Sequence, residues 1–225
     1  MSTKAAVATR ETEADARALV VETAREMSRQ NLSPGRSGNV SRRWRDGMLI
    51  TPSGMAYDAI VIKDIVFVDG DGATPKAVRK PSSEWRFHLS AYRARPDRHA
   101  VVHTHSLNAT VLACARLSIP AFHYMVATAG GADIPCVPYA TFGTEALSQH
   151  VAVGLQHRDA CLMANHGQIA IAETLPAALE LAAAVETLAE QYSRVLALGK
   201  PHILDAAEMA RVLEKFKSYG QKAQG

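Results

Sequence analysis

Two histidines, His103 and His105, stand two residues apart where an apolar run ends. Side chains alternate between the faces of a strand, so both imidazoles are expected on the same side. Two imidazoles on one face are half of a metal site, because zinc is commonly held by nitrogen ligands and keeps one position open in catalytic sites. The alternative is that one histidine is hydrogen-bonded at the strand end and the other faces solvent. The pair alone leaves both interpretations open.

Two further residues could complete such a site. His166 lies in a turn between two apolar runs, and Glu84 stands at the predicted start of a helix. Each has a simpler explanation, since a histidine at a strand end is often structural and an acid at a helix N-terminus is stabilised by the helix dipole. Together with the histidine pair they make three imidazoles and one carboxylate, which is a complete ligand set. Sequence spacing does not show that the four converge.

Three short polar stretches could bind an anion. Hydroxyls, an amide and open backbone N–H groups near a helix start can hold phosphate without an arginine. Taken singly, each stretch is most simply a turn or a helix cap. The residues are Gly38, Asn39, Ser53, Gly54, Ser82 and Ser83.

Composition excludes several classes of protein. The 225 residues are 48% hydrophobic and 21% charged, which is typical of a globular protein with one large core. The net charge of +3 is spread without a basic block, which argues against nucleic acid and suits a small anionic substrate. No apolar run approaches the roughly 20 residues of a membrane span, and the N-terminus lacks the apolar segment of a signal peptide. The three cysteines form no paired motif, so we expect free thiols and a cytoplasmic protein.

Hydrophobic periodicity and turn residues predict the order of the elements. Helices are expected over about residues 13–31, 84–95, 143–155 and 176–198, and from a cap at Asp205 to 220. Ser106 can cap a further helix that carries Val111, Leu112 and Ala115. Strands are expected over residues 39–45, 48–51, 65–69, 99–105, 160–165 and 168–172, and residues 134–138 are expected to be a short extended segment. Hairpins such as the one at Asp46-Gly47 outnumber strict strand–helix–strand units. We therefore expect a flexible segment over 1–12 and a single α/β domain over 13–225, with a largely antiparallel sheet covered by helices.

A colinear series of motifs runs through nearly the whole chain. The motifs are SGNVS at 37–41, GMLITPSG at 47–54, PSSEWRFH at 81–88, VVHTH at 101–105, IPAFHYM at 119–125, PYATFG at 138–143, HG at 166–167 and KFKSYG at 215–220. Over about residues 13–220 the sequence resembles the class II aldolase/adducin family. That resemblance implies a three-layer α/β/α fold with a central, mostly antiparallel sheet.

The resemblance also implies roles for particular residues. Zinc would be held by Glu84, His103, His105 and His166, and the substrate phosphate would lie on Gly38, Asn39, Ser53, Gly54, Ser82 and Ser83. Tyr124 would be a catalytic acid that reaches the neighbouring subunit's site in a four-fold symmetric homotetramer. Phe142 and Tyr219 would border the pocket for the aldehyde.

The implied reaction is the reversible cleavage of a ketose 1-phosphate, with L-fuculose 1-phosphate or a close analogue as substrate. The products would be dihydroxyacetone phosphate and a short aldehyde such as L-lactaldehyde, with Glu84 as the catalytic acid and base. A sugar-phosphate epimerase or dehydratase of the same family is the nearest alternative. A non-catalytic, adducin-like assembly module is a third interpretation, which loss of metal ligands would favour.

Three positions depart from the expected pattern. Asn165 stands where a second histidine is expected in fucose-specific enzymes, and Gln168 replaces an apolar residue. Ser53 stands where threonine is usual, which keeps the hydroxyl. These changes leave the implied metal and phosphate sites intact, so they bear on the identity of the aldehyde.

Overall fold

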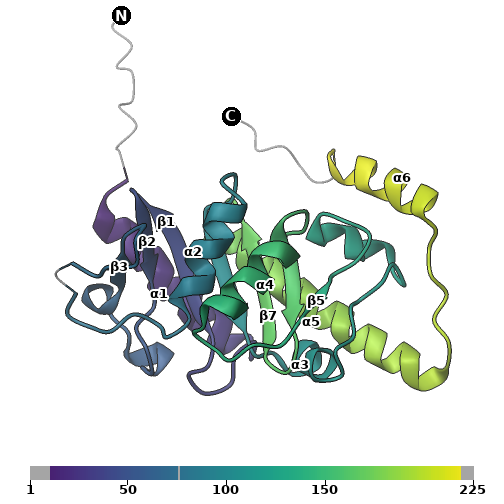
Figure 1. Ribbon diagram of the computed structural model, residues 1–225, viewed down its shortest axis with the longest axis horizontal. Coiled ribbons are helices and arrows are strands. Elements are labelled where there is room, and N and C mark those ends of the chain that lie inside the picture. Colours follow the sequence, from purple (N-terminus) through teal and green to yellow (C-terminus); the bar gives the residue numbers. More distant parts are fainter. Residues whose placement is uncertain (1–10, 76, 219–225) are drawn as a thin grey trace, which may run out of the picture.

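One mixed sheet forms the centre of the molecule. The computed structural model describes residues 11–75 and 77–218 (Figure 1). In this described part, seven strands lie in the order β3-β2-β1-β4-β7-β6-β5, and every neighbouring pair is antiparallel except β5 and β6. The strands are β1 (Asn39–Trp44), β2 (Gly47–Ile50), β3 (Val66–Val68), β4 (Ala100–Thr104), β5 (Cys136–Val137), β6 (Ala160–Met163) and β7 (Gly167–Ala172). The predicted mostly antiparallel sheet is therefore confirmed, with one parallel pair at its edge.

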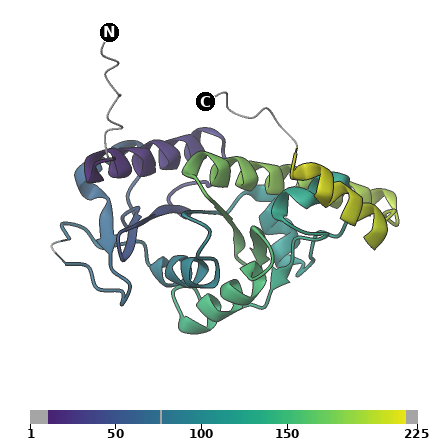
Figure 2. The same ribbon diagram turned by 90° about the horizontal axis from the view of Figure 1, so that it is seen from above.

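Helices cover both faces of this sheet, which gives three layers. In Figure 2, α1 (Glu13–Arg29) and α5 (Leu175–Leu198) lie along one face, while α2 (Trp85–Ala94) and α4 (Glu145–Leu155) lie on the other. The shorter α3 (Leu107–Cys114) packs against α5, and α6 (Ala206–Phe216) packs against the 3-10 helix over Tyr124–Ala129. The expected three-layer α/β/α architecture is confirmed.

The alternation of side chains along β4 divides the core into two parts. Val102 belongs to the cluster packed against α1 and α5, and Val101 belongs to the cluster packed against α2 and α4. Both valines are fully buried, so this central strand contributes to the core on both of its faces. His103 follows the same alternation and lies on the α2 side, where the Phe87 ring meets its edge at 5.2 Å between centroids.

Side-chain caps begin most of the long helices at the expected places. Thr12 and Asp15 form a reciprocal capping box at the start of α1. Thr144, Thr174 and Asp205 accept backbone N–H groups at the starts of α4, α5 and α6. Each cap satisfies a donor that the helix itself cannot pair, which explains why these helices begin where they do.

The hairpin predicted at Asp46-Gly47 is present, but Gly47 is not needed for a positive φ in the turn. The residue with positive φ is Arg45, at 52°, rather than the glycine. A Cβ on Gly47 would lie 2.1 Å from the Val68 backbone oxygen. Glycine is required here because β3 passes too close for any side chain.

Candidate metal centre

The end of β4 places two imidazoles side by side. His103 is fully buried at the end of the strand and His105 lies just beyond it, with their Nε2 atoms 3.0 Å apart. The other ring nitrogen of His103, Nδ1, lies 2.7 Å from the Gln168 backbone oxygen on β7. A backbone oxygen only accepts hydrogen bonds, so Nδ1 carries a proton, and Nε2 is the atom that presents a lone pair when the ring is neutral. The predicted common face of the two histidines is confirmed.

His166 reaches the same point from the turn between β6 and β7. Asn165, just before it, has a φ of 55°, and the His166 N–H donates to the Met163 backbone oxygen, which closes the turn. The His166 ring centroid lies 4.9 Å from those of His103 and His105. Three imidazoles from two chain segments therefore converge.

Glu84 supplies a carboxylate to this group. It occupies the N-cap position of α2, yet it makes no capping hydrogen bond. Its Oε2 lies 3.2 Å from His103 Nε2, and its Oε1 lies 3.0 Å from His166 Nε2. The side chain faces the histidines instead of the helix end, so the explanation of this acid through the helix dipole is insufficient.

The surroundings keep the carboxylate charged and an imidazole neutral. Burial alone would raise the pKa of Glu84, but the adjacent His103 and His166 outweigh it, and the pKa lies well below its usual range. Burial, together with the same two histidines, lowers the pKa of His105 to about 3. A neutral imidazole beside an ionised carboxylate is the protonation state in which both groups bind metal ions.

The donor set fits a divalent cation. One ligand atom from each of Glu84, His103, His105 and His166 lies within 4.8 Å of the others. His103 Nε2 faces both Glu84 Oε2 and His105 Nε2. All three atoms can donate a lone pair to a cation, so a divalent ion among them would be held by all three. The His103 proton on Nδ1 is the outer hydrogen bond that orients a ligating histidine. The four residues can thus hold a metal ion.

A pocket of about 390 Å³ opens beside the cluster. It is lined by Arg36, Ser37, Ser53, Gly54, Ser83, Glu84, His105, Tyr139, Ala140, Phe142, Asn165 and His166. Two loops meet here because Ser53 N–H donates to Lys80 O and Ser82 N–H donates to Thr51 O, both at 3.0 Å. This pairing brings two of the predicted polar stretches side by side.

Five of the six residues of the polar stretches fall into two groups. Ser53, Gly54 and Ser83 line the pocket, whereas Asn39 and Ser82 are buried around Glu84. Asn39 Nδ2 donates to Glu84 Oε2 at 2.8 Å, and Ser82 Oγ accepts the Glu84 N–H at 3.3 Å. The stretches therefore meet, and part of their hydrogen bonding serves the carboxylate.

Gly38 is the sixth of these residues, and its position explains why glycine is required. A Cβ there would lie 2.6 Å from the His103 backbone oxygen. The backbone of Gly38 therefore approaches β4 more closely than any side chain would allow.

The remaining candidates lie at or beyond the edges of this site. Phe142 lines the pocket and is largely exposed. Tyr124 is 51% exposed and lines a separate groove between its own 3-10 helix and α6. Tyr219 lies outside the described residues. Within one chain, the structure does not bring Tyr124 to the four candidate metal ligands.

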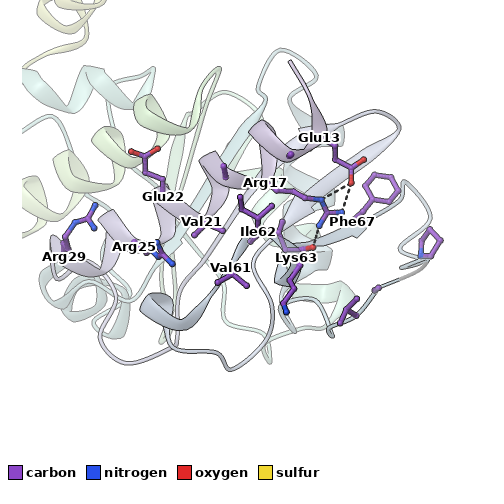
Figure 3. A pocket seen from close by; sticks show the side chains of 16 residues that line it. Glu13, Arg17, Val21, Glu22, Arg25, Arg29, Val61, Ile62, Lys63 and Phe67 are labelled. Carbon is purple, nitrogen blue, oxygen red and sulfur yellow. Dashed lines mark hydrogen bonds and ion pairs between the residues drawn. The ribbon is translucent and has the colours of Figure 1, made fainter. Parts of the chain in front are cut away.

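A larger groove beside α1 has a different character (Figure 3). It has a volume of about 1150 Å³ and runs between α1 and residues 61–78. Two of its basic side chains bond protein acceptors: Arg17 donates to Glu13 and to the Ile65 backbone oxygen, and Arg25 donates to the Ile60 backbone oxygen. The candidate metal ligands Glu84, His105 and His166 line the smaller pocket of about 390 Å³ instead.

Two features of the site were not predicted from the sequence. Arg36 brings a positive charge to the pocket, and its guanidinium donates to the Gly54 backbone oxygen at 3.0 Å. The sequence feature that could have indicated this role is a basic residue inside a glycine- and serine-rich loop. His88 lies behind the cluster and contacts Asn39, with Nε2 2.5 Å from Oδ1. Nothing in its spacing distinguished it from a core histidine on an amphipathic helix.

Comparisons with known proteins agree with this geometry. The model of the Class II Aldolase and Adducin N-terminal domain matches residues 18–193. The 5-methylthioribulose-1-phosphate/5-deoxyribulose-1-phosphate aldolase of Rhodospirillum rubrum is 54% identical over 205 residues, which cover 91% of this chain and 92% of that protein. The L-fuculose phosphate aldolase of Escherichia coli K12 is 51% identical over 202 residues, which cover 89% and 94%.

A solved structure leads to the same family. An L-fuculose 1-phosphate aldolase superposes with a TM-score of 0.87 at 39% identity, covering 90% of this chain and 96% of that one. The chain belongs to the class II aldolase and adducin family.

Proposed function

We propose that this class II aldolase reversibly cleaves a ketose 1-phosphate to dihydroxyacetone phosphate and a short aldehyde. The observation that carries the proposal is the convergence of Glu84 with three imidazoles beside a pocket edged by small polar loops. The two relatives named above are both aldolases of phosphorylated ketoses, and the chain spans nearly all of each. All four members of the ligand set are present, which argues against a non-catalytic assembly module.

The ligands are Glu84, His103, His105 and His166, and zinc is the proposed ion because imidazole and carboxylate ligands suit it. When bound, the ion supplies a Lewis acid that stabilises the negative charge left on the ketose fragment by carbon–carbon cleavage. His103 contributes by holding its lone pair toward the site through the hydrogen bond to Gln168 O.

Two side chains move protons at opposite ends of the broken bond. In the cleavage direction, Tyr124 of a neighbouring subunit takes the proton of the hydroxyl that becomes the aldehyde oxygen. Glu84 transfers a proton to and from the hydroxymethyl carbon of dihydroxyacetone phosphate. The exposure of Tyr124 on a groove outside its own chain's pocket leaves it accessible to another subunit, which supports a shared site. The proposed assembly is a four-fold symmetric homotetramer.

The phosphate end of the substrate lies against the polar loops. Ser53, Gly54 and Ser83 offer hydroxyls and open backbone groups on the pocket wall, and Arg36 adds a positive charge. Gly38, Asn39 and Ser82 complete the loops that shape this wall. Fixing the remote phosphate orients the reacting carbons against the catalytic groups.

The aldehyde end of the substrate is short and apolar at its tip. Tyr139, Ala140 and Phe142 line the same pocket, and Tyr219 is proposed to border it as well. L-fuculose 1-phosphate, which yields L-lactaldehyde, is the first candidate. 5-Methylthioribulose 1-phosphate and 5-deoxyribulose 1-phosphate are the second, favoured by the 54% identity to the Rhodospirillum rubrum aldolase and by Asn165 beside His166.

A coupled reductase assay that detects dihydroxyacetone phosphate tests this function. The metal-loaded enzyme is given each of the three ketose 1-phosphates, and the aldehyde is identified in parallel. Stoichiometric release of dihydroxyacetone phosphate supports the aldolase. Consumption of substrate with an isomeric or dehydrated product, and without dihydroxyacetone phosphate, identifies an epimerase or a dehydratase instead.

The setting of the enzyme is also part of the proposal. The described cysteines, Cys114, Cys136 and Cys161, are free thiols, which supports a reducing compartment such as the cytoplasm. The described part of the chain has no helix long and apolar enough to cross a membrane. The proposed metal ligands come from segments spread between positions 84 and 166 that meet beside one sheet, which supports a single domain over 13–225.

A further inference from the structure

A row of buried polar side chains leads from α2 to Glu84. The Tyr92 hydroxyl lies 2.9 Å from Ser41 Oγ, which lies 2.7 Å from His88 Nδ1. His88 Nε2 lies 2.5 Å from Asn39 Oδ1, and Asn39 Nδ2 lies 2.8 Å from Glu84 Oε2. Ser41 and His88 are fully buried, and Tyr92 and Asn39 are 3% exposed. Water therefore has little access to these groups, and each depends on the next.

The direction of each hydrogen bond follows from the carboxylate. The Asn39 Nδ2 donates to Glu84 Oε2, so the amide turns its carbonyl oxygen toward His88. That oxygen also only accepts, so His88 must carry a proton on Nε2.

The far end of the row is compatible with one direction as well. His88 is neutral, because its complete burial lowers its pKa to about 3. With Nε2 protonated, Nδ1 is bare and accepts from the Ser41 hydroxyl, which in turn accepts from Tyr92. All four donors point toward Glu84, and hydrogen bonds aligned in this way polarise and strengthen one another.

We propose that His88 is a positioning residue for Glu84, acting through the Asn39 amide. The Nε2–H of His88 holds the Asn39 oxygen, so the amide presents its N–H to the Glu84 carboxylate. Without that donor, nothing would hold the Asn39 amide in this orientation. The reversed amide would place its oxygen against the Glu84 carboxylate. This inference rests on the proposed function, in which Glu84 transfers the proton at the substrate carbon.

His88 also packs in the core, so the test must separate packing from donation. Its ring stacks on Phe87 at 4.9 Å between centroids. His88→Gln and His88→Met form a matched pair, because the two side chains have the same length and only glutamine offers an N–H near the position of Nε2. Metal content is measured for both variants, so that turnover is compared at equal loading.

We expect His88→Met to lower kcat by roughly 10- to 100-fold, as a buried acceptor loses its donor, with KM changed by less than about threefold. His88→Gln should retain kcat within about threefold of wild type. An equal loss in both variants would overturn the proposal, since packing alone would then explain the effect.

Tyr92→Phe is the control for stability. It removes a buried hydrogen bond at the end of the row furthest from Glu84 and leaves the His88 donor in place. We expect a lower unfolding temperature with kcat within about threefold of wild type. A loss of kcat matching that of His88→Met would assign the row a merely structural role.

A spectroscopic readout does not depend on turnover. Long-range ¹H–¹⁵N spectra of metal-free protein labelled in histidine identify which nitrogen of His88 carries the proton. We expect the proton on Nε2 and a bare Nδ1; a proton on Nδ1 would overturn the proposal. If wild type releases no dihydroxyacetone phosphate from any ketose 1-phosphate, the proposed function fails, while this spectrum still decides whether His88 donates to Asn39.

Discussion

Asn39 and His103 are register partners on adjacent strands, and both contact the same carboxylate oxygen. The β1–β4 pairing places their Cα atoms opposite each other. Asn39 Nδ2 lies 2.8 Å and His103 Nε2 lies 3.2 Å from Glu84 Oε2. Because a sheet register cannot slip by one residue without turning every side chain to the other face, this pair holds Glu84 at a fixed point.

Removing the metal is expected to abolish activity and lower stability. A chelator should eliminate release of dihydroxyacetone phosphate, and added zinc should restore it. Bound metal stabilises the folded state by mass action, by about 2.7 kcal/mol when the free ion is at 100 times its dissociation constant. Activity and unfolding temperature measured across a zinc titration check this. Full activity in protein shown by metal analysis to be free of metal would contradict it.

His105→Ala should remove the metal and leave the fold in place. His105 lies just after β4, so its loss leaves the strand pairing intact. We expect the purified variant to contain far less zinc than wild type and to show wild-type far-UV circular dichroism. His202→Ala is the matched control, because His202 is exposed near the chain's last helix. Equal metal content in wild type and His105→Ala would exclude His105 as a ligand.

Arg36→Ala should weaken binding of the phosphorylated substrate selectively. Losing a hydrogen bond to a charged group should cost about 1.5–3 kcal/mol, expressed in KM. Ser83→Ala, on the same pocket wall, should act in the same direction. The comparison is made between dihydroxyacetone phosphate and free dihydroxyacetone in the synthetic direction. Equal effects on both donors would place the phosphate elsewhere.

Tyr124→Phe should separate the two proton transfers. We expect it to retain hydrogen–deuterium exchange at the hydroxymethyl carbon of dihydroxyacetone phosphate, while cleavage and synthesis are lost. Glu84→Gln should lose both, and its metal content is measured because Glu84 is also a proposed ligand. If Tyr124→Phe stops the exchange too, this division of labour is wrong.

Mixing the two inactive variants tests whether the site is shared. Co-refolded Tyr124→Phe and Glu84→Gln chains should regain some activity, because certain sites then combine an intact Glu84 with Tyr124 from another chain. Each variant refolded alone is the control. Mixed oligomers with no activity above these controls would contradict a site that spans two subunits.

Acid should destabilise the metal-free protein partly through His88. Its pKa falls from the usual 6.5 to about 3 in the folded state, so between these values the unfolded chain binds a proton that the folded chain does not. Stability is therefore lost as pH falls from about 6.5 toward 3, by up to about 1.4 kcal/mol per pH unit for this group. The free energy of unfolding, measured with urea at several pH values from 7 to 4.5, should fall less steeply with pH for His88→Gln than for wild type. An equal pH dependence in the two proteins would contradict the neutral, buried His88.

Local patterns in the sequence predicted the elements, because each depends on neighbouring residues. The two-residue spacing of His103 and His105 on a strand and the Asp205 cap are examples. Ser106 shows the limit of such reasoning: it was expected to cap α3, but its hydroxyl accepts from Gln168 Nε2 at 2.9 Å and makes no cap. Gln168 on β7 is buried and donates to Ser106 instead, and a partner 62 positions away cannot be recognised from the residues next to Ser106.

Contacts between distant segments were harder to predict. The ligand set was recognised as a family resemblance, and its convergence became visible only when β4, the turn before β7 and the start of α2 were placed together. The row from Tyr92 to Asn39 had no sequence signal, because it joins α2 to β1 across about 50 positions. The role proposed for Tyr124 involves a neighbouring subunit, and contacts between subunits leave no local pattern in the sequence.

The Glu84–histidine cluster is proposed to serve the cleavage of a ketose 1-phosphate. The most direct measurement is the release of dihydroxyacetone phosphate from L-fuculose 1-phosphate and 5-methylthioribulose 1-phosphate by zinc-loaded and metal-free enzyme. We predict one dihydroxyacetone phosphate for each ketose consumed, from at least one of these substrates, and only with metal bound. Substrate consumed without release of dihydroxyacetone phosphate, or release at the same rate by the metal-free enzyme, would contradict a metal-dependent aldolase.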